Sequence, residues 1–232
     1  MRTEFYLGDN LDYIDFFEET GYRFDVIYGD CIYESEDFEW AKRCKDILTE
    51  DGIFYVQTDY HTVANYKLLL DDVYGRENFI NWLIYIQEWG GVPRRAFPRK
   101  HDDILMYANS DNYKFYRERI QIPKITANSN FNVSGRATKT PCDVFYDLGN
   151  FSTVSKERVK HNGKGFQWQK PLKLIDRLFL PVTDEGDWVF DPFGGVATVG
   201  VWCKENNRNY IGVENDESIF KLGKERLSGQ DT

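Results

Sequence analysis

The sequence predicts an α/β fold, with helices packed against a mostly parallel sheet. Apolar residues make up 41% of the 232 residues, which is enough to build one domain with a proper core. Short apolar runs alternate with segments of helical periodicity, the pattern that parallel sheets produce. In the last third of the chain, a strand-like run leads into a glycine-rich turn and then a helix, which is typical of ligand-binding α/β proteins.

The first part of the chain carries the alternation that defines the sheet. Strands are predicted where β-branched and aromatic residues form short runs, and helices where apolar residues recur at spacings of three and four. We expect "EDG" (50–52) to break the first helix and Gly75 to end the second. The predicted strands are 3–8, 24–28, 53–58, 79–86 and 103–108, and the predicted helices are 38–49 and 61–75.

The middle of the chain differs from both ends in its pattern of residue types and in its charge. Residues 88–168 mix polar, basic and aromatic side chains without clear periodicity, which predicts a loop-rich insert. Although the whole chain carries a net charge of −9, residues 94–173 contain 16 basic against 7 acidic residues, and the remainder contains 13 against 31. We therefore divide the chain into a first part (1–87), a basic insert that is expected to bind a polyanion (88–168) and a last part (169–232).

Several classes of protein are excluded by composition. No run approaches the roughly 18 apolar residues of a membrane span, and the start "MRTEFYLGDNLDYI" lacks the apolar centre of a secretory leader. The four cysteines show neither CxxC pairing nor histidine spacing, which argues against a metal site and against a disulfide framework. A cytoplasmic protein without membrane partners is the expectation.

The last third contains the pattern of a cofactor site. A helix is predicted over 170–182, and "DWVFDPFGGVATVGVWCKENNRNYIGVE" predicts strand 188–190, a glycine-rich turn, helix 197–206 and strand 209–213. Glycines let a ligand approach the backbone, and Glu214 follows the next strand, where an acid accepts hydrogen bonds from ribose hydroxyls. The lack of G-x-G-x-x-G and of a phosphate-binding lysine favours a nucleoside without a phosphate chain.

Taken together, these segments resemble the β class of S-adenosylmethionine-dependent amino-methyltransferases, which modify adenine N6 or cytosine N4 in DNA. "YLGDNLDYI" resembles the opening segment, "DCIY" (30–33) occupies the position of the catalytic D/S-P-P-Y tetrapeptide, and "QKPLKLIDRLF" and "DPFGGVATVG" resemble the cofactor half. The resemblance covers most of the chain. It implies a Rossmann-like, doubly wound sheet in circularly permuted order. It also implies that residues 1–87 are the catalytic half, that the basic insert (88–168) is the target-recognition region, and that residues 169–232 are the cofactor-binding half.

The resemblance also implies which residues bind S-adenosyl-L-methionine. Glu214 would hold the ribose, and Asp9 would lie near the cofactor. Asp191, Phe193 and Gly195 would surround its methionine and nucleoside parts, and Lys170 would help to line the pocket. The turn departs from the family pattern F-x-G-S/T-G, because Val196 replaces the hydroxyl residue and Ala197 replaces the last glycine. We expect the extra methyl group at Ala197 to be tolerated if the backbone there is helical.

The tetrapeptide keeps the groups that the chemistry needs and loses its prolines. Methyl transfer to an exocyclic amine requires two acceptors that orient the nitrogen lone pair, and an aromatic face that holds the extruded base. Asp30 and the carbonyl of Cys31 supply the acceptors, and Tyr33 supplies the aromatic face. Cys31 and Ile32 restore two N–H donors and relax the turn, from which we expect reduced but retained activity.

Cys31 itself has a second interpretation, as a nucleophile of the kind used in pyrimidine C5 methylation. The acidic neighbours Asp30, Glu34, Glu36 and Asp37 argue against this, because nearby anions raise the pKa of a thiol. A small apolar space filled by the cysteine is the favoured interpretation.

The sequence therefore predicts a DNA methyltransferase, with adenine N6 preferred because Asp opens the tetrapeptide. Arg94, Arg95, Arg99 and Lys100, with Trp89 and Phe97 among them, are the predicted DNA contacts, and Lys156, Arg158, Lys160 and Lys164 form a second basic group. Cytosine N4 or C5, RNA or a free nucleotide as acceptor, a catalytically impaired binding protein of the same fold, and a homodimer are left open.

Overall fold

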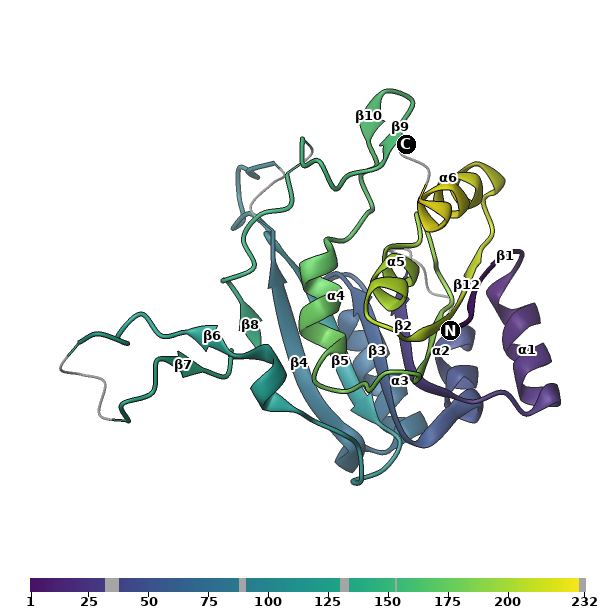
Figure 1. The fold of residues 1–232 in the computed structure, drawn as a ribbon, viewed down its shortest axis with the longest axis horizontal. Coiled ribbons are helices and arrows are strands. Elements are labelled where there is room, and N and C mark those ends of the chain that lie inside the picture. The colour runs from purple at the N-terminus through teal and green to yellow at the C-terminus, as the bar shows by residue number, and fades with distance from the viewer. Residues whose placement is uncertain (32–37, 88–90, 130–133, 153, 230–232) are drawn as a thin grey trace.

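The computed structural model describes residues 1–31, 38–87, 91–129, 134–152 and 154–229. Its centre is an eight-stranded sheet in the order β1-β12-β11-β2-β3-β5-β4-β8 (Figure 1). β5 runs antiparallel to its neighbours β3 and β4, and the other adjacent pairs are parallel. The strands are β1 (Thr3–Leu7), β2 (Phe24–Asp30), β3 (Leu48–Thr58), β4 (Phe79–Ile86), β5 (His101–Ala108), β8 (Val144–Phe145), β11 (Trp188–Asp191) and β12 (Asn209–Glu214).

Helices cover both faces of the sheet, which confirms the doubly wound α/β prediction (Figure 1). Val26 and Tyr28 of β2 face the cluster that includes α4 and α5, whereas Ile27 between them faces the cluster that includes α1, α2 and α3. This period-two alternation of buried side chains is what a strand covered on both faces requires. The helices are α1 (Asn10–Thr20), α2 (Glu39–Arg43), α3 (Val63–Tyr74), α4 (Leu172–Phe179), α5 (Thr198–Glu205) and α6 (Glu217–Ser228).

The prediction differs from the observed structure at one helix and its expected break, and it misses two further helices. The helix expected over 38–49 is only α2, followed by a 3-10 turn at Cys44–Ile47, and "EDG" lies inside β3 instead of ending a helix. Two helices were not predicted. α1 begins at the Asp9 cap and α6 at the Asp216 cap, and Gly21 and Gly229 end them in left-handed conformation. Polar residues are in the majority in both helices, so neither segment stands out by its overall hydrophobicity.

The insert leaves the body of the fold as an extended arm (Figure 1). Its short strands β6 (Ile122–Pro123) and β7 (Thr138–Lys139) pair only with each other, and β9 (Lys160–His161) and β10 (Lys164–Gly165) form a second small hairpin. Between them, β8 joins the edge of the main sheet beside β4. Residues 88–168 also include β5, a central strand of the main sheet, and the other described parts of this range are mostly loop.

Candidate active site

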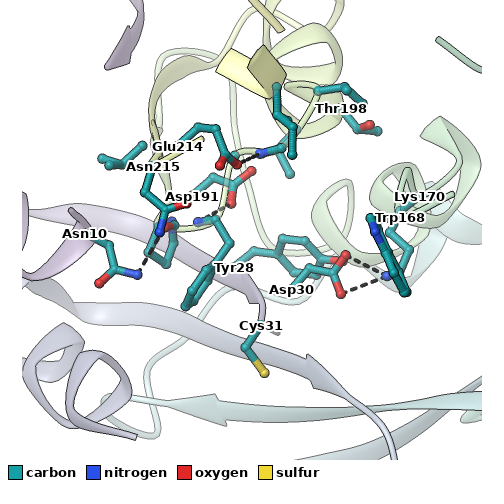
Figure 2. A pocket seen from close by; sticks show the side chains of 18 of the residues that line it. Asn10, Tyr28, Asp30, Cys31, Trp168, Lys170, Asp191, Thr198, Glu214 and Asn215 are labelled. Carbon is teal, nitrogen blue, oxygen red and sulfur yellow. Dashed lines mark hydrogen bonds and ion pairs between the residues drawn. The ribbon is translucent and has the colours of Figure 1, made fainter. Parts of the chain in front are cut away.

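The catalytic and cofactor halves meet where β2 and β11 pair in the centre of the sheet. β2 ends at Asp30 and β11 at Asp191, and the parallel pairing of these strands brings both carboxyl ends to one edge. Ligands of doubly wound folds bind at this edge, where the strand order reverses. A cavity of about 750 Å³ opens here, and among the residues that line it are Asp9, Asp30, Asp191 and Glu214 (Figure 2).

The glycine-rich turn is closed by Glu214. The Gly195 N–H donates to Glu214 Oε2 at 2.9 Å, and the Asp216 N–H donates to Oε1 at 2.8 Å. A carboxylate has about four acceptor positions, so both oxygens retain capacity for ligand hydroxyls. Gly195 has a φ of 53°, a conformation that favours glycine. The turn and the acid that follows the next strand therefore form one hydrogen-bonded unit.

The other predicted cofactor residues also line this cavity. Asp191 is buried, accepts from the Phe193 N–H at 3.1 Å, and has a pKa that burial raises well above its ordinary value. The Phe193 ring packs edge-on against Trp40 at 4.9 Å between centroids. Asp9 caps α1 by accepting from the Leu11 N–H at 2.9 Å. Asn10, which the sequence did not single out, lines the cavity and donates to the Pro192 carbonyl (Figure 2).

Ala197 does not have the helical backbone under which its extra methyl group was expected to be tolerated. Its backbone is left-handed, with φ 55° and ψ 40°, and not helical. This conformation costs a non-glycine residue about 1–2 kcal/mol. Ala197 lies at the start of α5 and is fully buried, so packing of the turn against the core holds the strained residue in place. The same left-handed backbone explains why the family pattern has a glycine at this position, since glycine adopts it without this cost.

Asp30 forms a buried ion pair with Lys170 (Figure 2). The Lys170 Nζ lies 2.8 Å from Oδ1 and 2.6 Å from Oδ2 of Asp30, and the two side chains are 10% and 18% exposed. Burial raises the pKa of Asp30 to about 6, even though the Lys170 ammonium acts in the opposite direction. Burial disfavours the charge on Lys170, but the carboxylates of Asp30 and Asp102 raise its pKa above the ordinary value. Lys170 lines the cavity as predicted, but its ammonium is bound to Asp30.

Cys31 is fixed by the neighbouring strand. Its N–H donates to the Gln57 carbonyl at 3.2 Å, and its Sγ lies 3.4 Å from the same oxygen. The N–H that a proline would lack is therefore used to anchor the end of β2. Before it, Gly29 allows the Trp40 indole to pack against the strand, because a Cβ at residue 29 would overlap with that ring.

The thiol of Cys31 is not activated. It is 4% exposed, and burial raises its pKa to about 11, with a smaller contribution from Asp30. The sequence argument for an inert thiol relied on flanking acids, whereas burial is the larger cause. Of those acids, Glu34, Glu36 and Asp37 lie outside the described residues, as do Ile32 and the predicted stacking residue Tyr33.

Trp168 lies at the mouth of the cavity beside the Asp30–Lys170 pair (Figure 2). Its side chain is 57% exposed, which is unusual for a tryptophan. In the sequence this residue stands only as an aromatic that follows the second basic group. Its position two residues before Lys170 was the signal in the sequence that could have placed it at the site.

The predicted DNA contacts lie in the loop between β4 and β5, at the same edge of the sheet as Asp30. Arg94 and Arg95 are exposed, and Lys100 is partly buried. The guanidinium of Arg99 lies 3.8 Å from the ring centroid of Tyr60, which follows β3. Trp89 lies outside the described residues.

The second basic group is only partly available to a ligand. Lys156, Lys160 and Lys164 are exposed, but Arg158 is 7% exposed. Its guanidinium donates to the carbonyls of Phe151, Ser152 and Phe166 at 2.6–3.0 Å. The donors of Arg158 are therefore used to fold the insert, whereas the three lysines of the group are exposed.

Comparison with known proteins identifies the class. A family model described as DNA methylase (N6_N4_Mtase) matches residues 33–225, and the chain belongs to this family. The Type II methyltransferase M.HpaI of Haemophilus parainfluenzae is 29% identical over 83% of this chain and 58% of its own length. M2.DpnII of Streptococcus pneumoniae is 25% identical over 83% of this chain and 66% of its own length. The chain thus spans roughly three fifths to two thirds of these curated relatives.

Solved structures share the fold. The complex of M1.HpyAVI with S-adenosylmethionine is 21% identical, with a TM-score of 0.67 over 97% of this chain and 99% of that one. The cytosine-N4-specific PvuII DNA methyltransferase is 15% identical, with a TM-score of 0.73 over 98% of this chain and 86% of that one. These likenesses confirm the predicted fold class.

S-adenosyl-L-methionine is the cofactor of this family. The cavity fits such a group, because its 750 Å³ lies within the roughly 300–1,000 Å³ of small-molecule sites. The left-handed Gly195 and the acceptors of Glu214 offer the close backbone approach and the hydroxyl recognition that a nucleoside needs. Within the described residues, no helix is long and apolar enough to span a membrane, and no cluster of metal-ligating side chains is found.

Proposed function

We propose that the chain is an S-adenosylmethionine-dependent DNA methyltransferase that acts on an exocyclic amino group, with adenine N6 as the preferred acceptor. One observation carries this proposal: the buried Asp30 carboxylate lines the same cavity as Asp191 and Glu214 of the cofactor half. An amine acceptor bound at Asp30 and a nucleoside cofactor bound at Glu214 would then share one enclosed space. The preference for adenine comes from Asp, instead of Ser, at residue 30.

The role of this chain in the reaction is to orient the amine and to hold its proton. When bound, the cofactor supplies a methyl group on a positively charged sulfur. Asp30 accepts one N–H of the amine and the carbonyl of Cys31 accepts the other, so that the nitrogen lone pair points into the cavity. With a pKa of about 6, Asp30 is ionised at neutral pH and able to accept the proton that the nitrogen releases.

The target base has to leave the duplex to reach Asp30, and an aromatic side chain has to hold it. Trp168 is well suited to this, because its indole is exposed at the cavity mouth next to the Asp30–Lys170 pair. We assign it one stacking face for the extruded base, in addition to the face expected from Tyr33.

Replacement of Trp168 by leucine, which keeps an apolar side chain but removes the π-face, is expected to lower kcat/KM for DNA by about tenfold to a hundredfold. Trp168→Phe should stay within a few-fold of wild type. Methylation rates on unmethylated bacterial DNA give both values, and calorimetry with S-adenosylmethionine checks that the cofactor half is intact. Equal activity of the leucine variant and the wild type would contradict this role.

Arg94 and Arg95 are expected to contact phosphates without reading sequence. Alanine at both positions should weaken DNA binding and flatten the dependence of log K on log salt concentration by about 0.9 per arginine. Lys204→Gln is the matched control, because Lys204 lies at the end of α5 that points away from the Asp30 edge and donates to the Leu227 carbonyl. Fluorescence anisotropy with labelled duplexes at several salt concentrations measures the slopes. An unchanged slope in the double variant would rule out the contact.

The direct test of the proposed function uses labelled S-adenosylmethionine, unmethylated DNA of varied sequence, and mass spectrometry of the digested nucleosides. N6-methyladenine is the expected product, and N4-methylcytosine would move the acceptor to cytosine. Cofactor binding without any methylated base would favour the alternative of a binding protein that no longer transfers methyl groups.

A further inference from the structure

A second buried carboxylate lies behind the Asp30–Lys170 pair. Asp102, near the start of β5, places Oδ2 3.7 Å from the Lys170 Nζ, and its side chain is 8% exposed. The same oxygen accepts hydrogen bonds from the side-chain amides of Gln57, at 2.8 Å, and of Gln87. Asp102 is therefore held in place by one amide from β3 and one from the residue that follows β4, beside the ammonium group that also binds Asp30.

Gln57, one of the two glutamines that hold Asp102, is itself held in place by its neighbours. Gln57 lies on β3, is fully buried, and accepts from the Tyr28 hydroxyl at 2.6 Å through its Oε1. This hydrogen bond leaves the Gln57 amide nitrogen directed at Asp102. Tyr28 lines the catalytic cavity two residues before Asp30, so the network begins and ends at the site.

The charges of this cluster do not cancel. Lys170 alone would neutralise Asp30, and an additional buried carboxylate costs free energy unless it has a function or a partner of its own. Two carboxylates and one ammonium leave one net negative charge next to the cavity. Low-dielectric surroundings make that charge effective over a longer range than it would be in water.

We propose that Asp102 is a positioning residue that shares Lys170 with Asp30 and keeps the catalytic corner net negative. This inference rests on the proposed function. During transfer, the amine lone pair forms the N–C bond while the electrons of the C–S bond return to sulfur. The nitrogen then carries the positive charge until it gives a proton to Asp30. A net negative corner stabilises that charge, whereas a neutral Asp30–Lys170 pair would stabilise it less.

The groups facing Asp30 come from three segments. Lys170 precedes α4, Asp102 belongs to β5, and Asp191 ends β11. The Lys170 ammonium lowers the pKa of Asp30 and the Asp102 carboxylate raises it, and the charge of Asp30 contributes in turn to the raised pKa of Asp191. Removing the charge of Asp102 should thus ease ionisation of Asp30 and yet weaken catalysis. A loss of packing would not produce this combination.

The test is Asp102→Asn, which keeps the shape of the side chain and an acceptor for the two glutamine amides. We expect the plateau kcat for DNA methylation to fall on the order of tenfold to a hundredfold, with KM for S-adenosylmethionine unchanged. The acid limb of the pH–kcat profile should move to lower pH. Asp103→Asn is the matched control, because Asp103 is the next residue, is equally buried, and accepts from the Trp82 indole instead of facing Lys170. Its plateau and its acid limb should match wild type.

Two results would overturn the inference: a wild-type plateau kcat in Asp102→Asn, or an acid limb that stays in place or moves to higher pH. Carbon-13 NMR of labelled aspartate carboxyls follows Asp30 directly and needs no activity, and Asp102→Asn should lower the pH at which Asp30 titrates. If the wild-type protein transfers no methyl group, the proposed function fails, and the NMR titration still tests the present inference. An Asp30 titration that Asp102→Asn does not change would then contradict the sharing of Lys170 by Asp30 and Asp102.

Discussion

Replacement of Asp30 by asparagine is expected to lower methyl transfer by at least about a hundredfold while cofactor affinity stays near the wild-type value. Asparagine removes the negative charge next to the amine and replaces one acceptor oxygen with an NH₂ donor. It also removes the nearer of the two described carboxylates that pair with Lys170, whereas Asp102 lies 3.7 Å from the ammonium. The rate of label transfer to DNA and calorimetry with S-adenosylmethionine measure the two quantities separately.

Asp25→Asn is the matched control for this variant. Asp25 lies on the same strand, and its carboxylate accepts from the Trp188 N–H at 2.7 Å, a bond that an asparagine oxygen can keep. The control should retain wild-type activity. Substantial methyl transfer by Asp30→Asn would exclude Asp30 as the acceptor of the amine proton and would remove the basis of the proposed mechanism.

Methylation is expected to require a pH above about 6. Burial raises the pKa of Asp30 to about 6, so its carboxyl group is neutral at pH values where an ordinary aspartate is charged. Only the ionised form accepts the amine N–H, and kcat should therefore fall about tenfold per pH unit below this value and reach a plateau above it. A pH–kcat profile at saturating DNA and cofactor measures the limb.

Lys170 determines the pH at which the acid limb of the kcat profile lies. Lys170→Met removes the ammonium that lowers the pKa of Asp30, and the acid limb should move to higher pH by about one unit or more. Activity that recovers in alkaline buffer distinguishes this effect from a misfolded variant. A limb that does not move would show that the observed titration belongs to another group.

The elements that the sequence predicted well are those with a strong local signal. β2, β3, β4, β5, β11 and β12 lie where apolar runs predicted strands, because a strand buried on both faces needs consecutive apolar residues. α3 ends at Gly75 as expected. α1 and α6 escaped prediction because polar residues are in the majority in both, and α2 is shorter than predicted because β3 begins at Leu48 to pair with β2.

The conformation of Ala197 shows the limit of local reasoning. The sequence places an alanine where a helix should begin, and local propensity favours a helical backbone there. The structure has the left-handed conformation, because the turn must return toward Glu214 while its residues pack into the core. Tertiary contacts decide such a position, since they outweigh a local cost of about 1–2 kcal/mol.

The sequence by itself determined the fold class, the family resemblance and the residues at the ends of the strands, among them Asp30, Asp191 and Glu214. These follow from periodicity and motif spacing, which are local properties of a chain. Only the tertiary structure brought Lys170 to Asp30 across 140 positions, placed Asp102 behind both, and buried the Cys31 thiol. The physical reason is that ion pairing and desolvation depend on which side chains meet in space, and pairing of distant strands fixes those contacts.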